Sequence, residues 1–478
     1  MFANIRSFYP IQELIRIARD HRIPLYIVGG VIRDCLRGSE MYHDCDFVVD
    51  GDVMACVAPF AKTVKGTVIP WDRDQIRVIF TFSEEKICFD FSRMRGSSLT
   101  EDLALRDFTV NACAVSLEEL ATNDQPQIID PCGGSEDLRA ARIVCCGPSC
   151  FMDDPVRILR AVRLARECRF SLDEEVLKAM AAHAEYIMQP SIERIKRELF
   201  SIFACDDVVV SLKELYDTGV LGQLIPEINT CIGIQQSFPH RYDLFHHIME
   251  TVRSIDLMSH NEFREFGLFA DILKVSCNTF IEEGVTRKAL LVFAALLHDI
   301  GKPATARTID DRITFYGHEK IGEKLCRKIA QRIGLGRTAQ RIVGKLIGSH
   351  MRLLQLCLLD TITERAMVRL IRDCEDVFWE LIILAYADAL ATGAQDSAYK
   401  EQVENIRLLA LKLAQKRTEE SYQRTAKPLL TGKDIINILG IPEGPMVGAI
   451  LAELHEREQQ GICSTREEAL EWLKKRQQ

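Results

Sequence analysis

The sequence predicts an α+β fold, with a small mixed β-sheet near the N-terminus followed by helical regions to the end of the chain. Short apolar runs between residues 25 and 91 are separated by glycines and charged turns, a pattern that is typical of strands. From Met152 onward the apolar residues recur at the helical period instead. At 478 residues the chain exceeds the usual size of one hydrophobic core, so we expect several domains.

The elements of the sheet region follow from local patterns in chain order. Amphipathic spacing predicts a helix over residues 11–20, before the first strand. A turn is expected at Glu84-Glu85, between the last two strands. The predicted strands are residues 25–28, 47–49, 68–69, 76–82 and 87–91, with further helices at 31–36 and 53–63.

Composition excludes several classes of protein. The chain is 47% hydrophobic and 27% charged, which is typical of soluble globular proteins. The apolar run 289–297 is too short to span a bilayer, and the N-terminus lacks the pattern of a signal peptide. The 17 cysteines form no Cys-x-x-Cys pair, which favours reduced thiols over disulfides or a thiolate zinc site. We therefore expect a cytoplasmic protein with no membrane partner, whose net charge of −9 requires any RNA-binding surface to be local.

Two carboxylates open the second apolar run of the sheet. Alternate residues of a strand point to the same side, so Asp44 and Asp46 converge. They repel each other unless a divalent cation lies between them. Just after the preceding run, Gly29-Gly30 lets backbone N–H groups approach an anion closely, because neither residue has a Cβ. Paired carboxylates beside a phosphate cradle are what metal-assisted phosphoryl transfer requires; two solvated acids on a surface turn are the alternative.

A further polar segment follows the predicted strands. Arg106 can face triphosphate oxygens, Asp107 can accept hydrogen bonds from ribose hydroxyls, and Asn111 can hold the loop or a phosphate.

Three segments together resemble the nucleotide-binding core of the tRNA nucleotidyltransferase and bacterial poly(A) polymerase family. They are Gly-Gly-Val-Ile-Arg-Asp at 29–34, Asp-Cys-Asp at 44–46 and Leu-Arg-Asp-Phe-Thr-Val-Asn-Ala at 105–112. The resemblance implies that Asp44 and Asp46 are catalytic ligands of Mg²⁺. It implies nucleotide contacts from Gly29, Gly30, Arg33, Asp34, Arg106, Asp107 and Asn111. Leu105 departs from the pattern, which has an arginine at that position.

The same superfamily commonly carries a third carboxylate on a neighbouring strand. By this resemblance Asp90, within the predicted strand 87–91, is a candidate metal ligand or base. An acid on an edge strand, without a catalytic role, is the alternative.

The helical part of the chain begins near residues 153–157, Asp-Asp-Pro-Val-Arg. We expect Asp153 or Asp154 to cap the first helix and Pro155 to lie in its first turn. Arginines then recur every three residues and spread over about half of the helix. They are Arg157, Arg160, Arg163 and Arg166. A solvated arginine-rich helix would look the same.

This segment resembles a family motif whose acidic residue and arginine select the incoming base through hydrogen bonds. The resemblance implies that role for Asp154 and Arg157, and nucleotide contacts from Arg160 and Arg163. Their chemistry suits the task, since a carboxylate accepts from an exocyclic amine and a guanidinium donates to ring nitrogens and carbonyls.

A second constellation of polar residues lies on a helical background between residues 243 and 388. Its members are His247, His298, Asp299, His318, His350 and Asp388. Imidazole and carboxylate together suit Mn, Fe, Ni, Zn or Mg. The set resembles the ligands of HD-superfamily phosphohydrolases, in which His318 and His350 match the extra ligands of binuclear members. His246 is the alternative to His247 in another register.

The resemblances together imply a division into four parts. These are a nucleotidyltransferase head (1–140), a helical neck for nucleotide selection and RNA binding (141–235), an HD region (236–395) and a helical tail that contacts RNA (396–478). The expected function is the addition of CMP, AMP or both, from CTP and ATP, to the 3′ end of tRNA or another RNA. Alternatives are poly(A) addition, and an HD phosphohydrolase whose head only binds nucleotide. Cofactors would be Mg²⁺ at the head and Mn, Ni, Fe, Zn or Mg²⁺ at the HD site, and the oligomeric state stays open.

Overall fold

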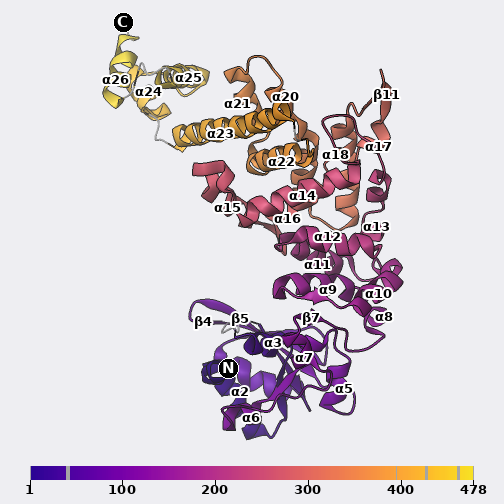
Figure 1. Cartoon of the computed structure of the whole chain (residues 1–478). Helices are drawn as coiled ribbons and strands as arrows, with labels where there is room; N and C mark the ends of the chain where they lie inside the picture. The colour runs from indigo at the N-terminus through magenta and orange to yellow at the C-terminus, as the bar shows by residue number, and fades with distance from the viewer. Residues whose placement is uncertain are drawn as a thin grey trace. The chain divides into compact units, whose positions relative to one another are not determined.

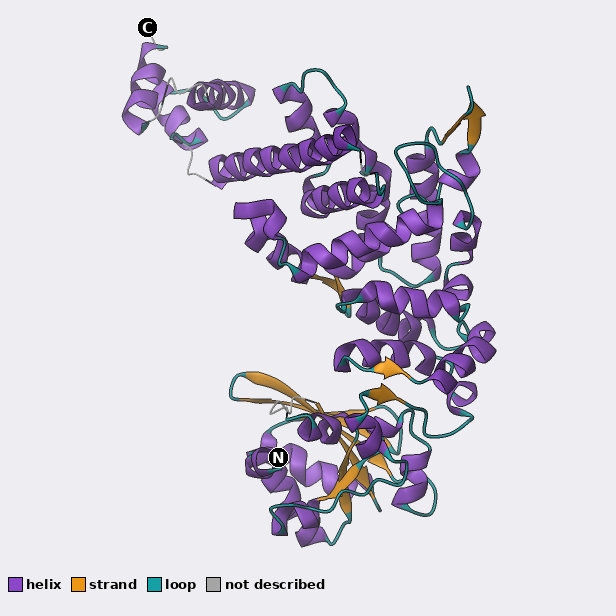
Figure 2. Ribbon diagram, in the orientation of Figure 1, coloured by secondary structure: helices purple, strands orange, loops and turns teal. Residues whose placement is uncertain are grey.

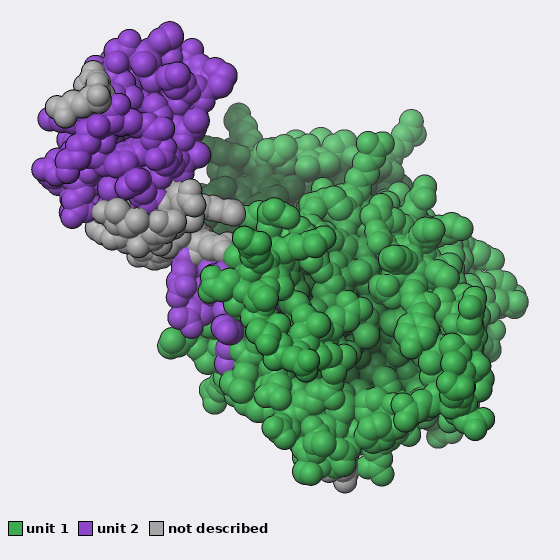
Figure 3. Space-filling view, turned by 90° about the horizontal axis from the view of Figure 1, so that it is seen from above, with its two compact units in different colours: residues 1–410 green, residues 411–478 purple. Residues whose placement is uncertain are grey.

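The computed structural model describes residues 2–38, 44–394, 396–425, 429–459, 463 and 465–476. Strands gather mainly in the N-terminal part, and helices make up most of the rest (Figure 1, Figure 2). This confirms the predicted α+β fold. The chain divides into two compact units, residues 1–410 and 411–478, coloured separately in Figure 3. The finer boundaries at residues 140, 235 and 395 stay a prediction.

One mixed sheet of six strands forms the centre of the head. The strands lie in the order β3-β4-β5-β2-β1-β6, and only the β2–β5 pair is parallel. Their bounds are β1 Leu25–Val28, β2 Asp44–Val49, β3 Thr67–Pro70, β4 Gln75–Phe82, β5 Glu85–Arg93 and β6 Ala114–Ser116.

The register of this sheet places polar residues of three strands in one row. Arg77 of β4 lies opposite Asp90 of β5, and Asp90 lies opposite Asp46 of β2. Residues directly opposite each other share a face, and Asp44 shares it as well because it is two residues from Asp46. The sheet therefore presents three carboxylates and one guanidinium on a single face.

The other face of the sheet carries the hydrophobic core. Phe47 and Phe89 are fully buried there, and the ring of Phe60 from α4 (Val53–Val64) stacks on Phe89 with centroids 5.5 Å apart. Helix α2 (Tyr9–His21) packs against α4, which itself packs against β4 and β5. Covering one face with helices leaves the opposite, polar face available for a site.

The remaining elements of the head are short. They are α1 Ala3–Ser7, α3 Gly30–Leu36, α5 Leu99–Ala104, η1 Thr109–Asn111, α6 Leu117–Thr122 and α7 Gly134–Arg139.

Helices of the neck follow directly. The elements are β7 Arg142–Ile143, α8 Cys150–Asp153, α9 Arg157–Cys168, β8 Ser171–Leu172, α10 Glu174–His183, η2 Ala184–Tyr186, α11 Ile192–Ala204, α12 Val208–Asp217, α13 Val220–Leu224 and η3 Pro226–Cys231. Helix α9 packs on α11 and α12, and its apolar side is buried between them.

The HD region is a helical bundle in which α14 packs against α16 and α22, and α19 packs against α16 and α18. Its helices are α14 Leu244–His260, η4 Arg264–Phe269, α15 Ala270–Asn278, α16 Arg287–Leu297, α17 Lys302–Thr305, α18 His318–Arg332, α19 Arg337–Ser349, α20 Met351–Cys357, α21 Glu364–Asp373, η5 Glu375–Val377 and α22 Phe378–Ala391. Two short hairpins interrupt it: β9 Phe280–Glu282 with β10 Val285–Thr286, and β11 Arg307–Ile309 with β12 Arg312–Thr314.

Helix α23 (Ser397–Thr425) leads into the second unit, which has its own small core. Three helices, α24 Gly432–Leu439, α25 Pro445–Gln459 and α26 Arg466–Lys475, bury Leu430, Ile435 and Leu473 completely. Capping boxes begin two of them, Thr431 with Asp434 and Thr465 with Glu468. No helix in the described part of the chain combines the length and apolar character that a membrane span needs.

Candidate active site and candidate metal centre

The two carboxylates at the start of β2 lie against the glycine turn that ends β1. Gly29 has φ +77°, a conformation that residues with a Cβ rarely adopt. A Cβ on Gly29 would also lie only 3.0 Å from Asp46 Oδ2. The turn therefore needs glycine for both reasons, and it brings the backbone close to the acidic pair.

Negative charge is concentrated at this point. Burial is the main cause that raises the pKa of Asp46 to about 6; Arg106 opposes this change, while Asp44 and Asp90 contribute to it. Burial and Asp90 likewise raise the pKa of Asp44 above its usual range. Carboxylates held together under these conditions fit a divalent cation, which offsets their repulsion and draws on their oxygens as ligands.

A cavity of about 660 Å³ and another of about 430 Å³ meet at these two carboxylates. The smaller one brings together the predicted nucleotide-binding residues of the head and the neck. It is lined by Gly29, Gly30, Arg33, Asp34, Arg106, Asp107, Asn111, Asp154, Arg157, Arg160 and Arg163, together with Asp44 and Asp46. Segments up to 134 residues apart in sequence thus converge on one polar space.

A chain of hydrogen bonds fixes the floor of the smaller cavity. Arg33 donates to both carboxylate oxygens of Asp34 at 2.9 Å and to Asn111 Oδ1 at 2.8 Å. Asn111 donates in turn to Asp107 Oδ1 at 3.2 Å, and Arg160 Nε contacts Asp107 Oδ2 at 3.1 Å. The network links α3, η1 and α9, so the positions of these side chains are set before any ligand binds.

The predicted base-selecting pair is held by different partners. Both oxygens of Asp154 accept from Arg194 of α11, at 3.1 and 2.5 Å. Arg157 donates to the carbonyls of Leu105 and Cys150 at 3.2 and 3.3 Å. Both residues line the smaller cavity.

The prediction that Asp153 or Asp154 caps the following helix is wrong. Helix α9 begins at Arg157 with Val156 as its N-cap, and no side chain caps it. Pro155 separates α8 from α9, and Asp154 between them has an extended backbone. The carboxylate of Asp154 is consequently directed to Arg194 and the cavity.

Asp90 lies on an interior strand, between β4 and β2, so the alternative of an edge-strand acid is wrong. Its two oxygens accept from Arg77 at 2.7 and 2.6 Å. Asp90 shares the face and the larger cavity with Asp44 and Asp46, with its charge balanced by a guanidinium. Its role as a metal ligand or base stays a prediction.

Sequence reasoning missed three residues of this site. Arg77 holds Asp90, and Arg194 holds Asp154. The third is the buried Asp102, whose carboxylate accepts from the side chains of Arg95 and Arg106 at 3.1 to 3.3 Å. The position of the turn before β5 is the signal that could have identified Arg77. The turn falls at Ser83-Glu84, both with positive φ, rather than at the predicted Glu84-Glu85. A two-residue turn at that position pairs residue 77 with residue 90.

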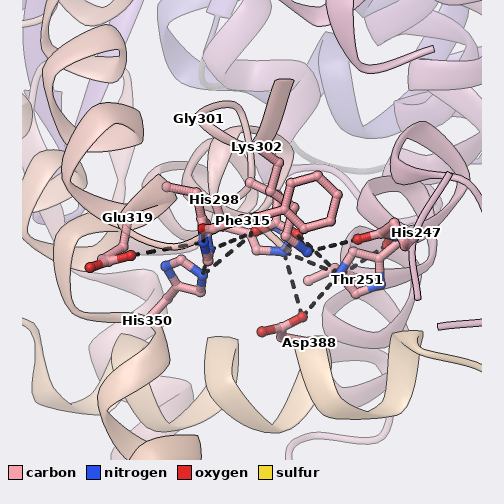
Figure 4. Close-up of polar contacts among 12 residues, drawn as sticks. His247, Thr251, His298, Gly301, Lys302, Phe315, Glu319, His350 and Asp388 are labelled. Atoms are coloured by element: carbon pink, nitrogen blue, oxygen red, sulfur yellow. Dashed lines mark hydrogen bonds and ion pairs between the residues drawn. The ribbon is translucent and has the colours of Figure 1, made fainter. Parts of the chain in front are cut away.

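The six predicted ligands of the HD region come together in the interior of the bundle (Figure 4). His247 of α14 lies with its Nε2 3.0 Å from Asp388 Oδ1 of α22 and 3.3 Å from His298 Nε2. His318 Nε2 lies 3.3 Å from His350 Nε2 on the other side of the cluster.

Asp299 lies between these two groups. Its Oδ2 is 3.1 Å from His298 Nε2, and its Oδ1 is 3.2 Å from His318 Nε2. Lys302 Nζ contacts Oδ2 at 2.6 Å. Two sets of ligand atoms, His247-His298-Asp388 and Asp299-His318-His350, are each close enough to hold one ion.

The hydrogen bonds of the imidazoles fit a metal centre. The Nδ1 atoms of His298, His318 and His350 face the carbonyls of residues three positions earlier, at 2.8, 2.8 and 2.7 Å. A carbonyl only accepts, so each Nδ1 carries a proton, and each Nε2 faces the cluster, where it can bind either a metal ion or a second proton. Two bare nitrogens 3.3 Å apart repel unless a cation or a proton lies between them. The donor set therefore suits divalent ions.

The electrostatics of the cluster agree with that fit. Burial lowers the pKa of His298, but Asp299 and Asp388 outweigh it and raise the pKa to about 10. The two carboxylates therefore favour a positive charge at Nε2 of His298, which a proton supplies in the metal-free cluster and a divalent ion would supply in its place. Burial and the nearby His298 lower the pKa of His350 to about 4. His246 is exposed and bound to Asp243, so the alternative to His247 is wrong.

A cavity of about 600 Å³ opens beside this cluster. Asp299, His318, His350 and Asp388 reach into it, and Lys302 and His240 also line it. Apolar side chains make up most of the remaining wall, among them Phe315, Met351, Leu354 and Tyr399. Burial lowers the pKa of His240, which packs against the ring of His247, to about 3.

Comparison with known proteins gives three family matches along the chain. Residues 25–144 match the Poly A polymerase head domain, residues 169–232 the probable RNA and SrmB-binding site of polymerase A, and residues 266–393 the HD domain. A Multifunctional CCA protein of Neisseria meningitidis is 30% identical over 318 residues, which cover 64% of this chain and 68% of the relative. The chain belongs to the tRNA nucleotidyltransferase and poly(A) polymerase family.

Other members of the family match over nearly the whole chain. An A-adding tRNA nucleotidyltransferase of Deinococcus radiodurans is 28% identical, with 93% of each chain covered. A CC-adding tRNA nucleotidyltransferase of Geobacter sulfurreducens is 27% identical and covers 98% of this chain and 96% of its own. The similarity to A-adding and to CC-adding members is thus nearly equal.

Solved structures of the same family share the fold. The Thermotoga maritima CCA-adding enzyme complexed with tRNA has a TM-score of 0.58 at 21% identity, with 97% of this chain and 93% of that chain covered. The match to the HD domain begins at residue 266, after His247, yet α14 supplies His247 to the cluster. All six candidate ligands of the HD region therefore lie in one cluster, although His247 falls outside the matched residues.

Proposed function

We propose that this chain transfers CMP, AMP or both from CTP and ATP to the 3′ hydroxyl of tRNA. One observation carries the proposal: the motif residues of the head and of the neck line a single cavity that also contains Asp44 and Asp46. The alternative of poly(A) addition uses the same residues and differs in the RNA and bases that are accepted.

Asp44 and Asp46 would hold Mg²⁺, which lowers the barrier by offsetting charge on the transferring phosphate. Gly29 supplies close backbone approach to the phosphates, and Arg106 supplies positive charge beside Asp46. Asp107, fixed by Asn111 and Arg160, has its carboxylate at the cavity wall, where it can accept from a ribose hydroxyl.

Base selection is proposed to reside in Asp154 and Arg157. An Asp accepts from the exocyclic amine that C and A share, and an Arg donates to ring nitrogens or a carbonyl. Both also have protein partners, Arg194 for Asp154 and the Leu105 carbonyl for Arg157, which limit their freedom to turn toward other bases.

The test uses purified protein, each NTP singly, and three tRNA substrates that lack one, two or three terminal nucleotides. Incorporation of C on the two shorter substrates and of A on the longest would establish CCA addition. C alone or A alone would place the chain with the CC-adding or the A-adding members. Long A tracts on unrelated RNA would favour poly(A) polymerase.

A head that binds nucleotide without transferring it is the remaining alternative. An intact pair of acids beside the glycine turn argues against it, because binding alone does not require two converging carboxylates. Asp46→Asn provides the control: it retains the side-chain volume and removes the charge. If wild type and Asp46→Asn incorporate equally little of any nucleotide, the transferase proposal fails.

We further propose that the HD cluster is a metal-dependent phosphohydrolase site that holds two divalent ions. His247, His298 and Asp388 would hold one ion, and His318 and His350 the other, with Asp299 between them. Bound ions of this type generate a hydroxide nucleophile at neutral pH. Lys302, 2.6 Å from Asp299, orients that carboxylate and adds positive charge to the cavity where a phosphate ester would bind.

Metal analysis of protein purified without chelator tests the HD proposal directly. We expect close to two transition-metal ions per chain, and hydrolysis of 2′,3′-cyclic nucleotides or small phosphate esters with Mn²⁺ or Ni²⁺. If no bound metal is detected and no hydrolysis follows the addition of either ion, the HD proposal fails and the HD region is only a helical spacer. The proposed RNA contact of the tail can be tested by comparing tRNA affinity of the whole chain with that of residues 1–410.

A further inference from the structure

The larger cavity at the carboxylate pair has a different wall from the smaller one. Both cavities are lined by Asp44 and Asp46 and by four arginines, Arg95, Arg106, Arg160 and Arg163. The larger one differs in extending over β4 and β5 to Trp71, on the loop between β3 and β4. None of the glycine-turn residues lines it. A transfer reaction needs two substrates that meet at the metal, so a cavity on each side of the carboxylates suits the reaction.

Trp71 is the prominent feature of this second cavity. Its side chain is 60% exposed, although large aromatic residues are ordinarily mostly buried. The guanidinium of Arg77 lies 4.8 Å from the ring centroid, and Asp90 fixes that guanidinium through two hydrogen bonds. The loop itself is closed by a bond from Trp71 N to the Gln75 carbonyl at 2.9 Å. The ring is therefore held in place while much of it stays open to solvent.

A cation on the opposite wall complements the ring. Arg197 of α11 lines the cavity and is exposed, and it has no carboxylate within ion-pair distance among the residues that the structure describes. The other arginines of this cavity on the neck helices, Arg160 and Arg163, are paired with Asp107 and Glu198. Arg197 is the one whose charge is available to a phosphate.

The sheet register sets the distance between the ring and the reacting centre. Arg77, beneath the ring, and Asp46 are separated by one intervening strand, so their Cα atoms lie about 10 Å apart. One nucleotide can span that gap with its hydroxyl at the carboxylates and its base at the ring. Aromatic rings bind unpaired bases by stacking without regard to their identity, which a growing 3′ end requires.

We infer that the Trp71 cavity binds the 3′-terminal nucleotide of the RNA, with Trp71 stacked on its base and Arg197 contacting its phosphate. This inference rests on the proposed transferase function. It assigns the acceptor strand to the β4–β5 side of Asp44 and Asp46, opposite the NTP in the smaller cavity. Arg77 acts as a positioning residue, since it contacts the ring rather than the RNA, and Asp90 fixes its guanidinium.

Trp71→Ala tests the inference by steady-state kinetics. Losing one stacking contact should raise the KM for tRNA about 10-fold, while the KM for the NTP and the rate at saturating tRNA stay within twofold. Trp71→Phe, which retains a stacking ring, should recover most of the affinity. Tyr9→Ala removes another exposed aromatic of the head, which lines neither cavity, and should behave as wild type.

Arg197→Ala should also raise the KM for tRNA, and should reduce the slope of log affinity against log salt by about one. Arg19→Ala on α2 is the matched control for loss of an exposed charge outside both cavities. An unchanged tRNA KM in Trp71→Ala, or an equal rise in the KM for the NTP, would overturn the inference and leave the transferase proposal standing.

A binding measurement separates the inference from catalysis. The chain has three tryptophans, so Trp379→Phe with Trp472→Phe leaves Trp71 as the only one. A short RNA that ends in CC should quench its fluorescence, and the same RNA with an abasic 3′-terminal nucleotide should quench it less per bound molecule. Quenching that is the same for both RNAs would place the terminal base elsewhere, whether or not the chain proves to transfer nucleotides.

Discussion

The head and the HD region each gather acidic side chains, but they supply different shares of a metal's ligands. In the head, Asp44 and Asp46 are two carboxylates on one strand, facing open cavities lined by arginines. In the HD region, six side chains from several helices surround a buried point, and Asp299 joins its two halves. Mg²⁺ is commonly held by one or two carboxylates plus substrate phosphates, whereas imidazole-rich sets bind transition metals without substrate.

This difference has a consequence if both sites hold the metals proposed above. The head would need its nucleotide to complete the coordination of Mg²⁺, so metal and substrate would bind together. The HD cluster would supply its ligands without substrate, so we expect bound ions to remain through purification. Removing a ligand at one site should consequently leave the other intact, since separate sites couple only through a shared conformational change.

Asp46→Asn should have the largest effect of any single change. We expect nucleotide incorporation to fall at least about 1,000-fold, equivalent to about 4 kcal/mol of transition-state stabilisation, because one of the two carboxylates proposed to hold the ion is lost. Incorporation is measured with radiolabelled NTP on tRNA lacking its terminal nucleotides. Hydrolysis and metal content at the HD site should equal those of wild type. Robust nucleotide incorporation by Asp46→Asn would rule out the proposal that Asp44 and Asp46 hold the catalytic ion.

Changes in the HD cluster should affect metal content in steps. Asp299→Asn should lose both ions and all hydrolysis, because that carboxylate lies between the two ligand sets. His318→Ala should lose one ion of two. Metal content by mass spectrometry gives a readout independent of activity, and nucleotide addition should stay within about twofold of wild type. Equal metal loss in both variants would show that the two half-sites are not separate.

Much of both sites could be predicted from local sequence. The spacing of Asp44 and Asp46, and the run that contains Arg106 and Asp107, are features of a few consecutive residues, and the structure brings them together as expected. In the HD region His298 and Asp299 were identified because the two are adjacent after an apolar run. Predictions of this type succeed because strand alternation and turn chemistry are local.

Contacts between distant segments could not be predicted in the same way. The pairing of Asp154 with Arg194 joins residues 40 apart, and it depends on how α11 packs against α9. Asp154 was a predicted cap of the helix α9, but α9 begins at Arg157, and the carboxylate of Asp154 binds Arg194 instead. A one-residue error in the turn before β5 similarly hid the pairing of Arg77 with Asp90.

Arg157→Ala should change which base is added more than it changes total turnover. A bidentate contact to a base edge is worth about 1–3 kcal/mol of discrimination, so the ratio of C to A incorporation should shift by about 10-fold. Incorporation with CTP and ATP in competition, at equal concentrations, measures the ratio. Arg166→Ala is the matched control, since Arg166 lies on the same helix, is paired with Glu214 and does not line the nucleotide cavity. A uniform loss of rate with an unchanged ratio would leave Arg157 as a structural residue only.

Leu105→Arg should have the smallest effect, and it addresses the one departure from the family motif in the head. Leu105 is 49% exposed at the end of α5, and its carbonyl accepts from Arg157, so an arginine side chain there can extend without displacing any core residue. If the nucleotide is already held by Arg106 and the neck arginines, one more exposed charge adds little.

We expect the KM of Leu105→Arg for the NTP to fall by about two- to fivefold, in line with the modest energy of an exposed ion pair, with no change in the C to A ratio. Leu105→Gln, of similar length and no charge, separates charge from packing. A fall of 100-fold or more in the KM of Leu105→Arg for the NTP would contradict this expectation. It would mean that the nucleotide contact made by the family arginine is missing from this chain, and that its other arginines do not replace it.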